Sequence, residues 1–216
     1  MIDLHTHTIF SDGALIPSEL ARRAEVAGYR GLAFTDHGDA ANIDFIIPRL
    51  VHVCRKLQSS YRIRLVPGIE LTHVPPDDIA PLAGESRKLG ARIVVVHGET
   101  LAEPVAPGTN HAALLAGIDI LAHPGLIAEE DVLLAARNGI ALELSARRGH
   151  ALANGHVAKL ARRHGASLIV NTDAHAPGDL ISAVQAARIA AGAGLDETEI
   201  SALIAHAEAL LKKIQL

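Results

Sequence analysis

The hydrophobic positions of the chain gather into seven short runs, each followed by turn-forming residues. The runs cover residues 2–7, 31–37, 64–70, 92–98, 119–125, 140–146 and 167–175. Within most of them, valine, isoleucine and leucine are continuous rather than alternating with polar residues. That pattern is typical of parallel strands that are buried on both faces. The runs therefore predict seven parallel strands.

Amphipathic or alanine-rich segments lie between the runs, and their ends carry helix-boundary residues. The clearest of these predicted helices are 16–29, 154–165 and 196–213. The first has Pro17 near its first turn and Gly28 close to its end. The last begins with Asp196 and Glu199, a pair typical of a capping box. Strand and helix thus alternate, which predicts an α/β fold, and seven strands favour a closed, TIM-like (βα)7 barrel over an open sheet.

Two segments rich in proline and glycine, 73–81 and 98–110, predict loops. The second is expected to be ordered over a cleft. The sequence contains no linker, charge block or low-complexity tract that marks a domain boundary. We therefore expect one barrel domain over residues 1–216.

The amino-acid composition indicates which classes of binding partner the protein is expected to have. Hydrophobic residues make up 49% of the chain, yet tryptophan is absent and only five residues are phenylalanine or tyrosine. Scarce aromatics and a formal charge of −4 argue against a nucleic-acid partner. Cys54 is the only cysteine, so an intrachain disulfide is excluded. With neither a membrane-spanning run nor a signal peptide, we expect a cytoplasmic protein without a membrane partner.

Histidine and acidic side chains occur where the predicted strands end. The candidates are His5, His7, Asp12, His37, Glu70, His97, His123, Asp173 and His175. Because the carboxyl ends of parallel barrel strands face the same way, these side chains are expected to converge on one rim, where barrel enzymes carry their active sites. Residues two apart on a strand point to one face, so each of the pairs His5/His7 and Asp173/His175 can serve one site.

This mixture of imidazole and carboxylate predicts a metal site. Zinc, manganese and iron accept both ligand types, whereas a calcium or magnesium cage is nearly all oxygen. One ion needs three or four protein ligands. Nine candidates are too many for one ion and enough for two or three, with a carboxylate such as Glu70 able to bridge two ions.

Several motifs match one family. "HTHTIFSDG", "TDH" and "NTDAH", with Glu70, His97 and "AHPG" between them, resemble the polymerase-and-histidinol-phosphatase (PHP) family of metallophosphoesterases. The resemblance implies a distorted seven-stranded (βα) barrel with a trinuclear metal site. It implies a first ion at His5, His7, Glu70 and Asp173, a second at Glu70, His97 and His123, and a third at Asp12, His37 and His175.

The implied activity is hydrolysis of a small phosphomonoester, as in a histidinol phosphatase. We hypothesise in-line attack by a hydroxide that bridges two metal ions. Arg147 and Arg148 follow the sixth predicted strand and are candidates for binding the phosphate. His150 is expected to contact the substrate. Glu143 is expected either to support a metal ligand or to pair with an arginine.

Two alternatives remain open at this point. An amidohydrolase also begins with a His-x-His pair, but it typically has a bridging lysine, and Lys56 and Lys88 both fall in predicted helices. A non-catalytic metal-bound module is the second alternative, and the filled set of nine ligand positions argues against it. The sequence leaves open the substrate, the native metal, the general acid for the leaving group and the oligomeric state.

Overall fold

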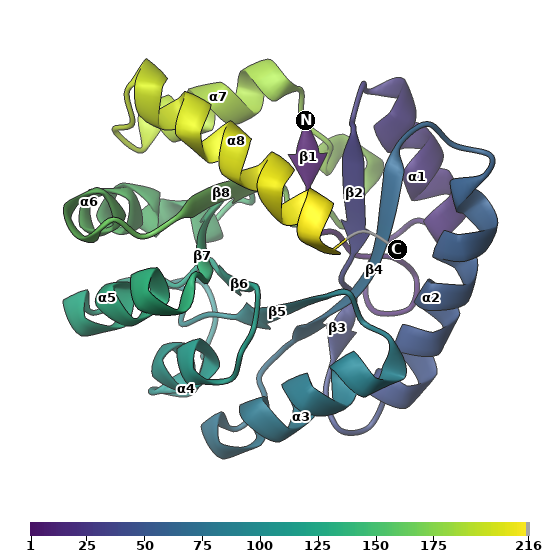
Figure 1. Cartoon of the computed structure of the whole chain (residues 1–216), viewed down its shortest axis with the longest axis horizontal. Coiled ribbons are helices and arrows are strands. Elements are labelled where there is room, and N and C mark those ends of the chain that lie inside the picture. The colour runs from purple at the N-terminus through teal and green to yellow at the C-terminus, as the bar shows by residue number, and fades with distance from the viewer. Residues whose placement is uncertain (215–216) are drawn as a thin grey trace.

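The computed structural model describes residues 1–214 and shows a parallel barrel ringed by helices (Figure 1). Its strands are β1 (Ile2–Asp3), β2 (Gly31–Phe34), β3 (His37–Gly38), β4 (Arg64–Leu71), β5 (Ile93–His97), β6 (Ile120–Ala122), β7 (Ala141–Ser145) and β8 (Leu168–Asn171). They pair in parallel in the order β1-β2-β4-β5-β6-β7-β8, and β3 pairs with β4. The predicted seven-stranded barrel is confirmed, with its second strand realised in two pieces, β2 and β3.

The barrel closes where its first and last strands meet. Thr6 and Ala174, just beyond β1 and β8, form a parallel bridge. The His7 amide donates to the Ala174 carbonyl at 2.9 Å, and the Asp173 amide donates to the His5 carbonyl at 3.0 Å. Closure therefore joins the two segments that carry four of the candidate ligands.

The helices follow the strands in alternation. They are α1 (Pro17–Val26), α2 (Ile43–Gln58), α3 (Pro76–Leu89), α4 (Thr109–Leu115), α5 (Glu129–Asn138), α6 (Asn154–His164), α7 (Ala183–Gly192) and α8 (Glu197–Ile214), with short 3₁₀ turns at His150–Ala153 and Pro177–Asp179. The capping box is present, since the Asp196 amide donates to Glu199 Oε2 and the Glu199 amide donates to Asp196 Oδ1, each at 2.9 Å.

The prediction of a loop over 73–81 was wrong from Pro76 onward, because α3 begins there. A proline in the first helical turn loses no hydrogen bond that the helix would have made. Asp77 and Asp78 in that turn favour the helix further through its dipole. Segment 98–110 is a loop up to the start of α4 at Thr109.

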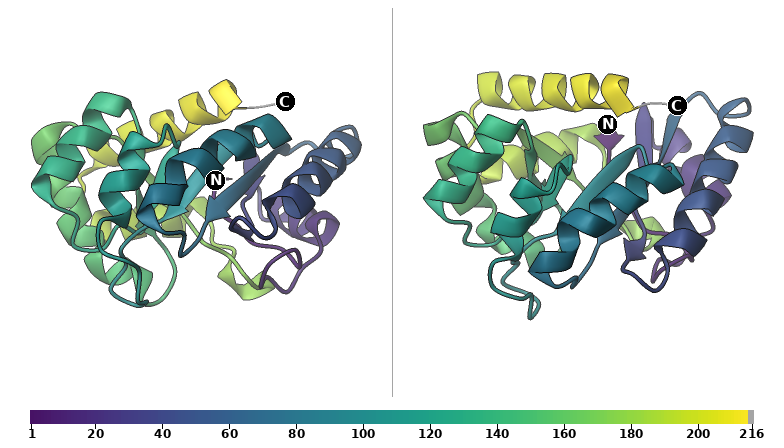
Figure 2. Two further views of the ribbon diagram at one scale, coloured as in Figure 1. Left: turned by 90° about the horizontal axis from the view of Figure 1, so that it is seen from below. Right: turned by 60° about the horizontal axis from the view of Figure 1, so that its bottom comes forward.

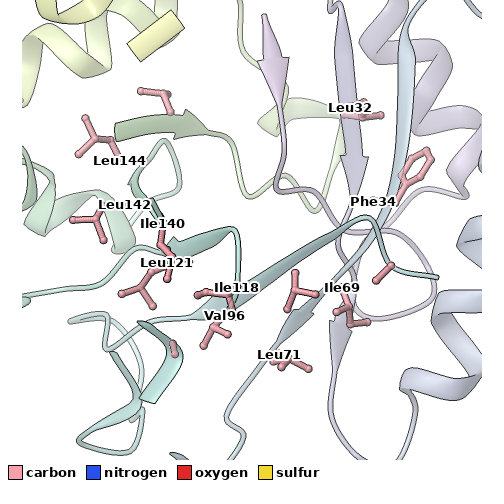
Figure 3. Packing of buried hydrophobic residues seen from close by; sticks show 14 of the residues in the cluster. Leu32, Phe34, Ile69, Leu71, Val96, Ile118, Leu121, Ile140, Leu142 and Leu144 are labelled. Carbon is pink, nitrogen blue, oxygen red and sulfur yellow. The ribbon is translucent and has the colours of Figure 1, made fainter. Parts of the chain in front are cut away.

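Each strand packs on two sides. In β5, Val94 and Val96 face outward into the layer between barrel and helices, while Ile93 and Val95 face the barrel interior. Figure 3 shows the outward layer, which includes Val96 and residues of the neighbouring strands. Alternation places the next residue, His97, in line with the inward row. The interior is thus apolar along the strands and becomes polar where the strands end.

Helix α8 covers the amino-terminal end of the barrel. Its Ala207, Leu210, Leu211 and Ile214 are buried with the interior residues of the strands. Figure 2 shows α8 lying across one end of the barrel, with the strand-to-helix loops at the other. The rim with the candidate ligands is therefore the open end. None of the helices within residues 1–214 combines the length and the apolar character that crossing a membrane requires.

Gly125 allows two loops at the rim to approach each other closely. Gly125 has a φ of +61°, and a Cβ atom there would overlap the carbonyl group of Glu99. We expect Gly125→Ala to lower the free energy of unfolding by about 2–5 kcal/mol, since it adds backbone strain to a steric clash. Gly165, with a φ of +71° and no atom within 4 Å of its virtual Cβ, is the control. Gly165→Ala should cost only about 1–2 kcal/mol. Urea denaturation measures both, and equal losses would contradict the overlap.

Candidate metal centre

The nine predicted ligands all lie at the open rim. His5 and His7 follow β1, and Asp12 lies in the loop after them. The others lie in or just after later strands: His37 in β3, Glu70 in β4, His97 in β5, His123 after β6, and Asp173 and His175 after β8. All except Asp12, His37 and His175 are buried. The barrel topology thus gathers side chains from the whole length of the chain at one place.

The four residues expected at the first ion position are in mutual contact. His5 Nε2 lies 3.2 Å from Glu70 Oε1 and 3.7 Å from Asp173 Oδ1. His7 Nε2 lies 3.1 Å from Asp173 Oδ1 and 3.7 Å from Glu70 Oε2. Two imidazole nitrogens and two carboxylates therefore face a common point.

The three residues expected at the third position also come together. Asp12 Oδ1 lies 3.1 Å from His175 Nε2 and 3.4 Å from His37 Nε2. The two imidazole nitrogens are 3.5 Å apart. His7 belongs to the same group of potential ligands, so the first and third positions adjoin.

The residues expected at the second position are grouped differently. His97 and His123 form a potential metal-binding group with His150. Glu70 reaches only the edge of this group, with Oε1 3.8 Å from His123 Nε2. Within residues 1–214, no potential metal-binding group combines Glu70 with His97. His150, predicted to contact substrate, therefore lies buried beside two candidate ligands.

Sequence reasoning missed Glu103. It lies in the loop between β5 and α4, and its Oε2 is 3.1 Å from His97 Nε2 and 3.3 Å from His73 Nε2. Its Oε1 is 3.5 Å from His150 Nε2. The prediction that segment 98–110 is ordered over a cleft pointed to this loop. No spacing pattern singled out Glu103 within the loop.

Buried ring and carboxylate atoms at the rim lack hydrogen-bond partners. They include His5 Nε2, His7 Nε2 and Glu70 Oε1. Burying a polar atom without a partner costs free energy, and such atoms are rare in folded proteins. Here they face one another, and nitrogen and oxygen donors of this kind suit zinc, manganese or iron. The residues therefore fit the divalent ions that the sequence predicts.

Hydrogen bonds to the Nδ1 atoms orient the imidazole rings of His5 and His97. His5 Nδ1 lies 2.8 Å from Glu143 Oε2, which also accepts a bond from Asn171 Nδ2 at 2.9 Å. His97 Nδ1 lies 3.2 Å from the Gly98 carbonyl. Such contacts hold the proton on Nδ1 and leave Nε2 free for an ion. Of the two roles expected for Glu143, the structure shows support of a candidate ligand.

Glu143→Gln tests that support. The variant keeps the shape of the side chain but weakens the bond to His5, so we expect metal affinity to fall about 10–100-fold with the fold retained. Titration of zinc into metal-free protein measures the affinity, and circular dichroism checks the fold. Glu130→Gln, on the exposed first turn of α5, is the matched control. Wild-type affinity in Glu143→Gln would show that the contact with His5 is dispensable.

Asp36 orients the loop that carries Asp12. It accepts hydrogen bonds from the Thr8 amide at 2.7 Å and from the Ser11 amide at 3.1 Å. The Thr8 and Ser11 hydroxyl groups also donate to it, at 2.9 and 2.8 Å. These bonds fix the turn between β1 and α1. Asp36 is therefore a positioning residue, because it holds the loop after β1 in place. The candidate ligand is the next residue, His37.

Burial and neighbouring charges shift the pKa values of the ionisable groups at the centre. Burial disfavours charge on Glu70, yet His5 and His37 hold its pKa well below the usual range. Burial also lowers the pKa of His7 and of His123 well below that of free histidine. Burial raises the pKa of Asp173 to about 7, while nearby His5 acts in the opposite direction. Burial disfavours charge on His5 and His37, yet the neighbouring Glu70 raises the pKa of both, so a metal ion that binds there must displace their protons.

Backbone strain is concentrated at the same rim. Among residues 1–214, the non-glycine residues with positive φ are His73 at 53°, His123 at 27° and Asp173 at 53°. All three face the centre or its loop. Strained backbone of this kind costs about 1–3 kcal/mol per residue and persists at functional sites, where surrounding contacts impose it.

The candidate substrate residues differ in their surroundings. Arg147 Nη1 donates to the Asp173 carbonyl at 3.1 Å and lies 2.6 Å from His175 Nδ1. Its Nε lies 3.6 Å from Asp173 Oδ2. Arg148 is exposed. Arg147 is thus already in contact with two candidate ligands, whereas Arg148 is directed to solvent.

Comparison with known proteins agrees with the motifs. A family model for the PHP domain matches residues 3–214. The uncharacterized protein MJ1295 of Methanocaldococcus jannaschii is 45% identical over 98% of this chain and 99% of its own length. A probable phosphatase of Clostridium novyi is 28% identical over 81% of this chain and 79% of its own length.

Two solved structures share the fold. A chain of archaeal ribonuclease P, solved with mature tRNA, has a TM-score of 0.74 at 17% identity, covering 97% of this chain and 90% of that one. Histidinol phosphate phosphatase from Lactococcus lactis, solved with zinc, L-histidinol and phosphate, has a TM-score of 0.59 at 16% identity, covering 90% and 94%. Because the family model spans nearly the whole chain, we conclude that this protein belongs to the PHP-domain family.

Proposed function

We propose that the protein is a metal-dependent phosphoesterase that hydrolyses a small phosphomonoester. The observation that carries the proposal is the set of nine candidate ligands at one rim, with buried nitrogen and oxygen atoms that lack partners. Two or three divalent ions held there would activate water and neutralise charge on the phosphoryl oxygens. The family and its phosphatase-like relatives support this reading.

We assign the candidate ligands to three separate ion positions. We assign the first position to His5, His7, Glu70 and Asp173, and the third to Asp12, His37 and His175. His97 and His123 belong to the second position. Zinc, manganese and iron all suit this donor set, and zinc is the metal in the Lactococcus lactis enzyme.

Two arginines would bind the phosphate. Arg147 lies beside Asp173, and its guanidinium can donate to a phosphoryl oxygen next to the ions. The exposed Arg148, one residue further, can close over the substrate from the solvent side.

The space over the rim suits a small substrate. A cavity of ≈ 370 Å³ is lined by Asp12, His37, Thr72, His73 and Glu103, among others. This volume lies at the lower end of the range for small-molecule sites, about 300–1,000 Å³. A larger cavity of ≈ 790 Å³ lies far from the candidate ligands, beside Asp119 and Lys213. We place the substrate in the smaller cavity because it adjoins the ligands.

A non-catalytic role beside RNA is the second candidate. The fold likeness to a chain of archaeal ribonuclease P favours it, and weakens the expectation from net charge that no nucleic acid is bound. The nine ligand positions argue for catalysis, because a scaffold does not require them. An amidohydrolase is less suited, since Lys56 lies in α2 and Lys88 in α3, both exposed.

The decisive experiment measures phosphate release from a panel of phosphomonoesters, with zinc, manganese or iron added to metal-free protein. Turnover that requires the metal supports the proposal and identifies the substrate class. The same preparation is then tested for binding to structured RNA. RNA binding without release of phosphate from any ester would favour the non-catalytic role.

A further inference from the structure

His150 is held in one orientation at the rim. It begins the 3₁₀ turn after β7 and is 5% exposed. Its Nδ1 lies 2.7 Å from Thr100 Oγ1, and Thr100 Oγ1 also accepts a bond from the Ala102 amide at 3.3 Å. Thr100 already acts as an acceptor, which suits donation from the Nδ1–H of His150. The lone pair of Nε2 is then free and faces the centre.

Three histidines from consecutive strand ends converge at that point. The ligand nitrogens of His97, His123 and His150 all lie within 4.8 Å of one another. The ring centroids of His123 and His150 are 4.1 Å apart, and those of His97 and His123 are 4.5 Å apart. Three imidazoles suffice as the protein ligands of one zinc ion.

Glu103 lies where a fourth ligand would be. Ligand atoms about 2.0–2.1 Å from a tetrahedral ion are separated from one another by about 3.4 Å. Glu103 Oε2 is 3.1 Å from His97 Nε2, and Oε1 is 3.5 Å from His150 Nε2. Glu70 Oε1, at 3.8 Å from His123 Nε2, is further away.

We propose that His150 is a metal ligand that completes the second ion position with His97 and His123, and that Glu103 is its fourth, exchangeable ligand. The proposal rests on the proposed function only in requiring that the rim binds divalent ions. It replaces the expectation that His150 contacts the substrate.

The surroundings of Glu103 explain why its place is exchangeable. The residue lies on a loop rather than a strand, and its side chain is 40% exposed. A second histidine, His73, lies 3.3 Å from Oε2 and offers the carboxylate another partner when it leaves the ion. An anionic substrate can therefore displace Glu103, whereas the buried histidines stay in place.

The test is zinc titration of the metal-free protein without substrate, with visible spectra of the cobalt(II) form. We expect His150→Ala to bind one ion fewer than wild type, or to bind its weakest ion at least about 100-fold more weakly, with a changed cobalt spectrum. Glu103→Gln should weaken the same ion about tenfold or more. Thr100→Val, which removes the acceptor of the bonds from His150 Nδ1 and from the Ala102 amide, should fall between wild type and His150→Ala.

His52→Ala, which removes an exposed histidine on α2, is the control and should keep every ion. Circular dichroism verifies that each variant is folded. Wild-type ion number and affinity in His150→Ala, together with a raised KM, would overturn the proposal and restore the role in substrate contact. If the wild-type protein bound no ion at all, both this proposal and the proposed function would fail. Ion binding without phosphatase activity would leave the ligand assignment standing and remove only the function.

Discussion

Asp173→Asn is expected to abolish nearly all of the proposed phosphatase activity while the barrel stays folded. Asp173 Oδ1 lies 3.1 Å from His7 Nε2, and Oδ2 lies 3.8 Å from His123 Nε2, so this carboxylate faces both sides of the centre. Asparagine tolerates the positive φ of this position but carries no charge. Loss of an ion removes several kcal/mol of transition-state stabilisation, which corresponds to a fall in kcat/KM of about 10³-fold or more.

Metal analysis and phosphate release together check this result. Asp173→Asn should retain fewer ions than wild type, and added metal should restore little activity. Asp44→Asn, on the exposed first turn of α2, is the control for loss of one negative charge. An unchanged metal content in Asp173→Asn would show that the assignment of the first position is wrong.

Chelation should lower the melting temperature of the wild-type protein by about 8–16 °C. A ligand present at 1,000 times its Kd stabilises the folded state by about 4 kcal/mol. In a protein of this size, each kcal/mol corresponds to about 2–4 °C. Removing the ions leaves buried groups such as Glu70 and His7 facing one another without a cation between them. Differential scanning calorimetry with and without a chelator measures the shift.

Two comparisons sharpen the chelation experiment. The Asp173→Asn variant should show a smaller shift than wild type, because it has fewer ions to lose. Zinc or manganese should restore the melting temperature better than calcium, which prefers an all-oxygen cage. A melting temperature that the chelator does not change would contradict a metal-bound centre.

Much of the fold could be predicted from the sequence because its strands are short, continuous apolar runs. The second run divides into β2 and β3, and Asp36, in the break between them, accepts bonds from the loop after β1. This partnership crosses from one strand to another, so no local pattern reveals it. The start of α3 was missed because Pro75 and Pro76 favour a loop in isolation, although the second proline is acceptable in a first helical turn.

The candidate site was predictable to the extent that its residues occupy strand ends. His5, Glu70 and Asp173 could be recognised as candidates because they lie at the ends of predicted strands, and they lie close together in the structure. Glu103 lies in an irregular loop, where spacing carries no information about direction. The closeness of His150 to His97 depends on the turn after β7, whose path follows from tertiary packing.

The meeting of β1 with the segment after β8 also bears on the order of assembly. Asp3 and Thr172, which share a hydrogen bond across this seam, are 169 residues apart in the chain. Contacts between such distant residues form late, because closing a long loop costs entropy before any contact is gained. His5 and His7 are synthesised before Asp173 and lack it until most of the barrel has been synthesised. We therefore expect metal loading of the proposed first position to belong to the last stage of folding.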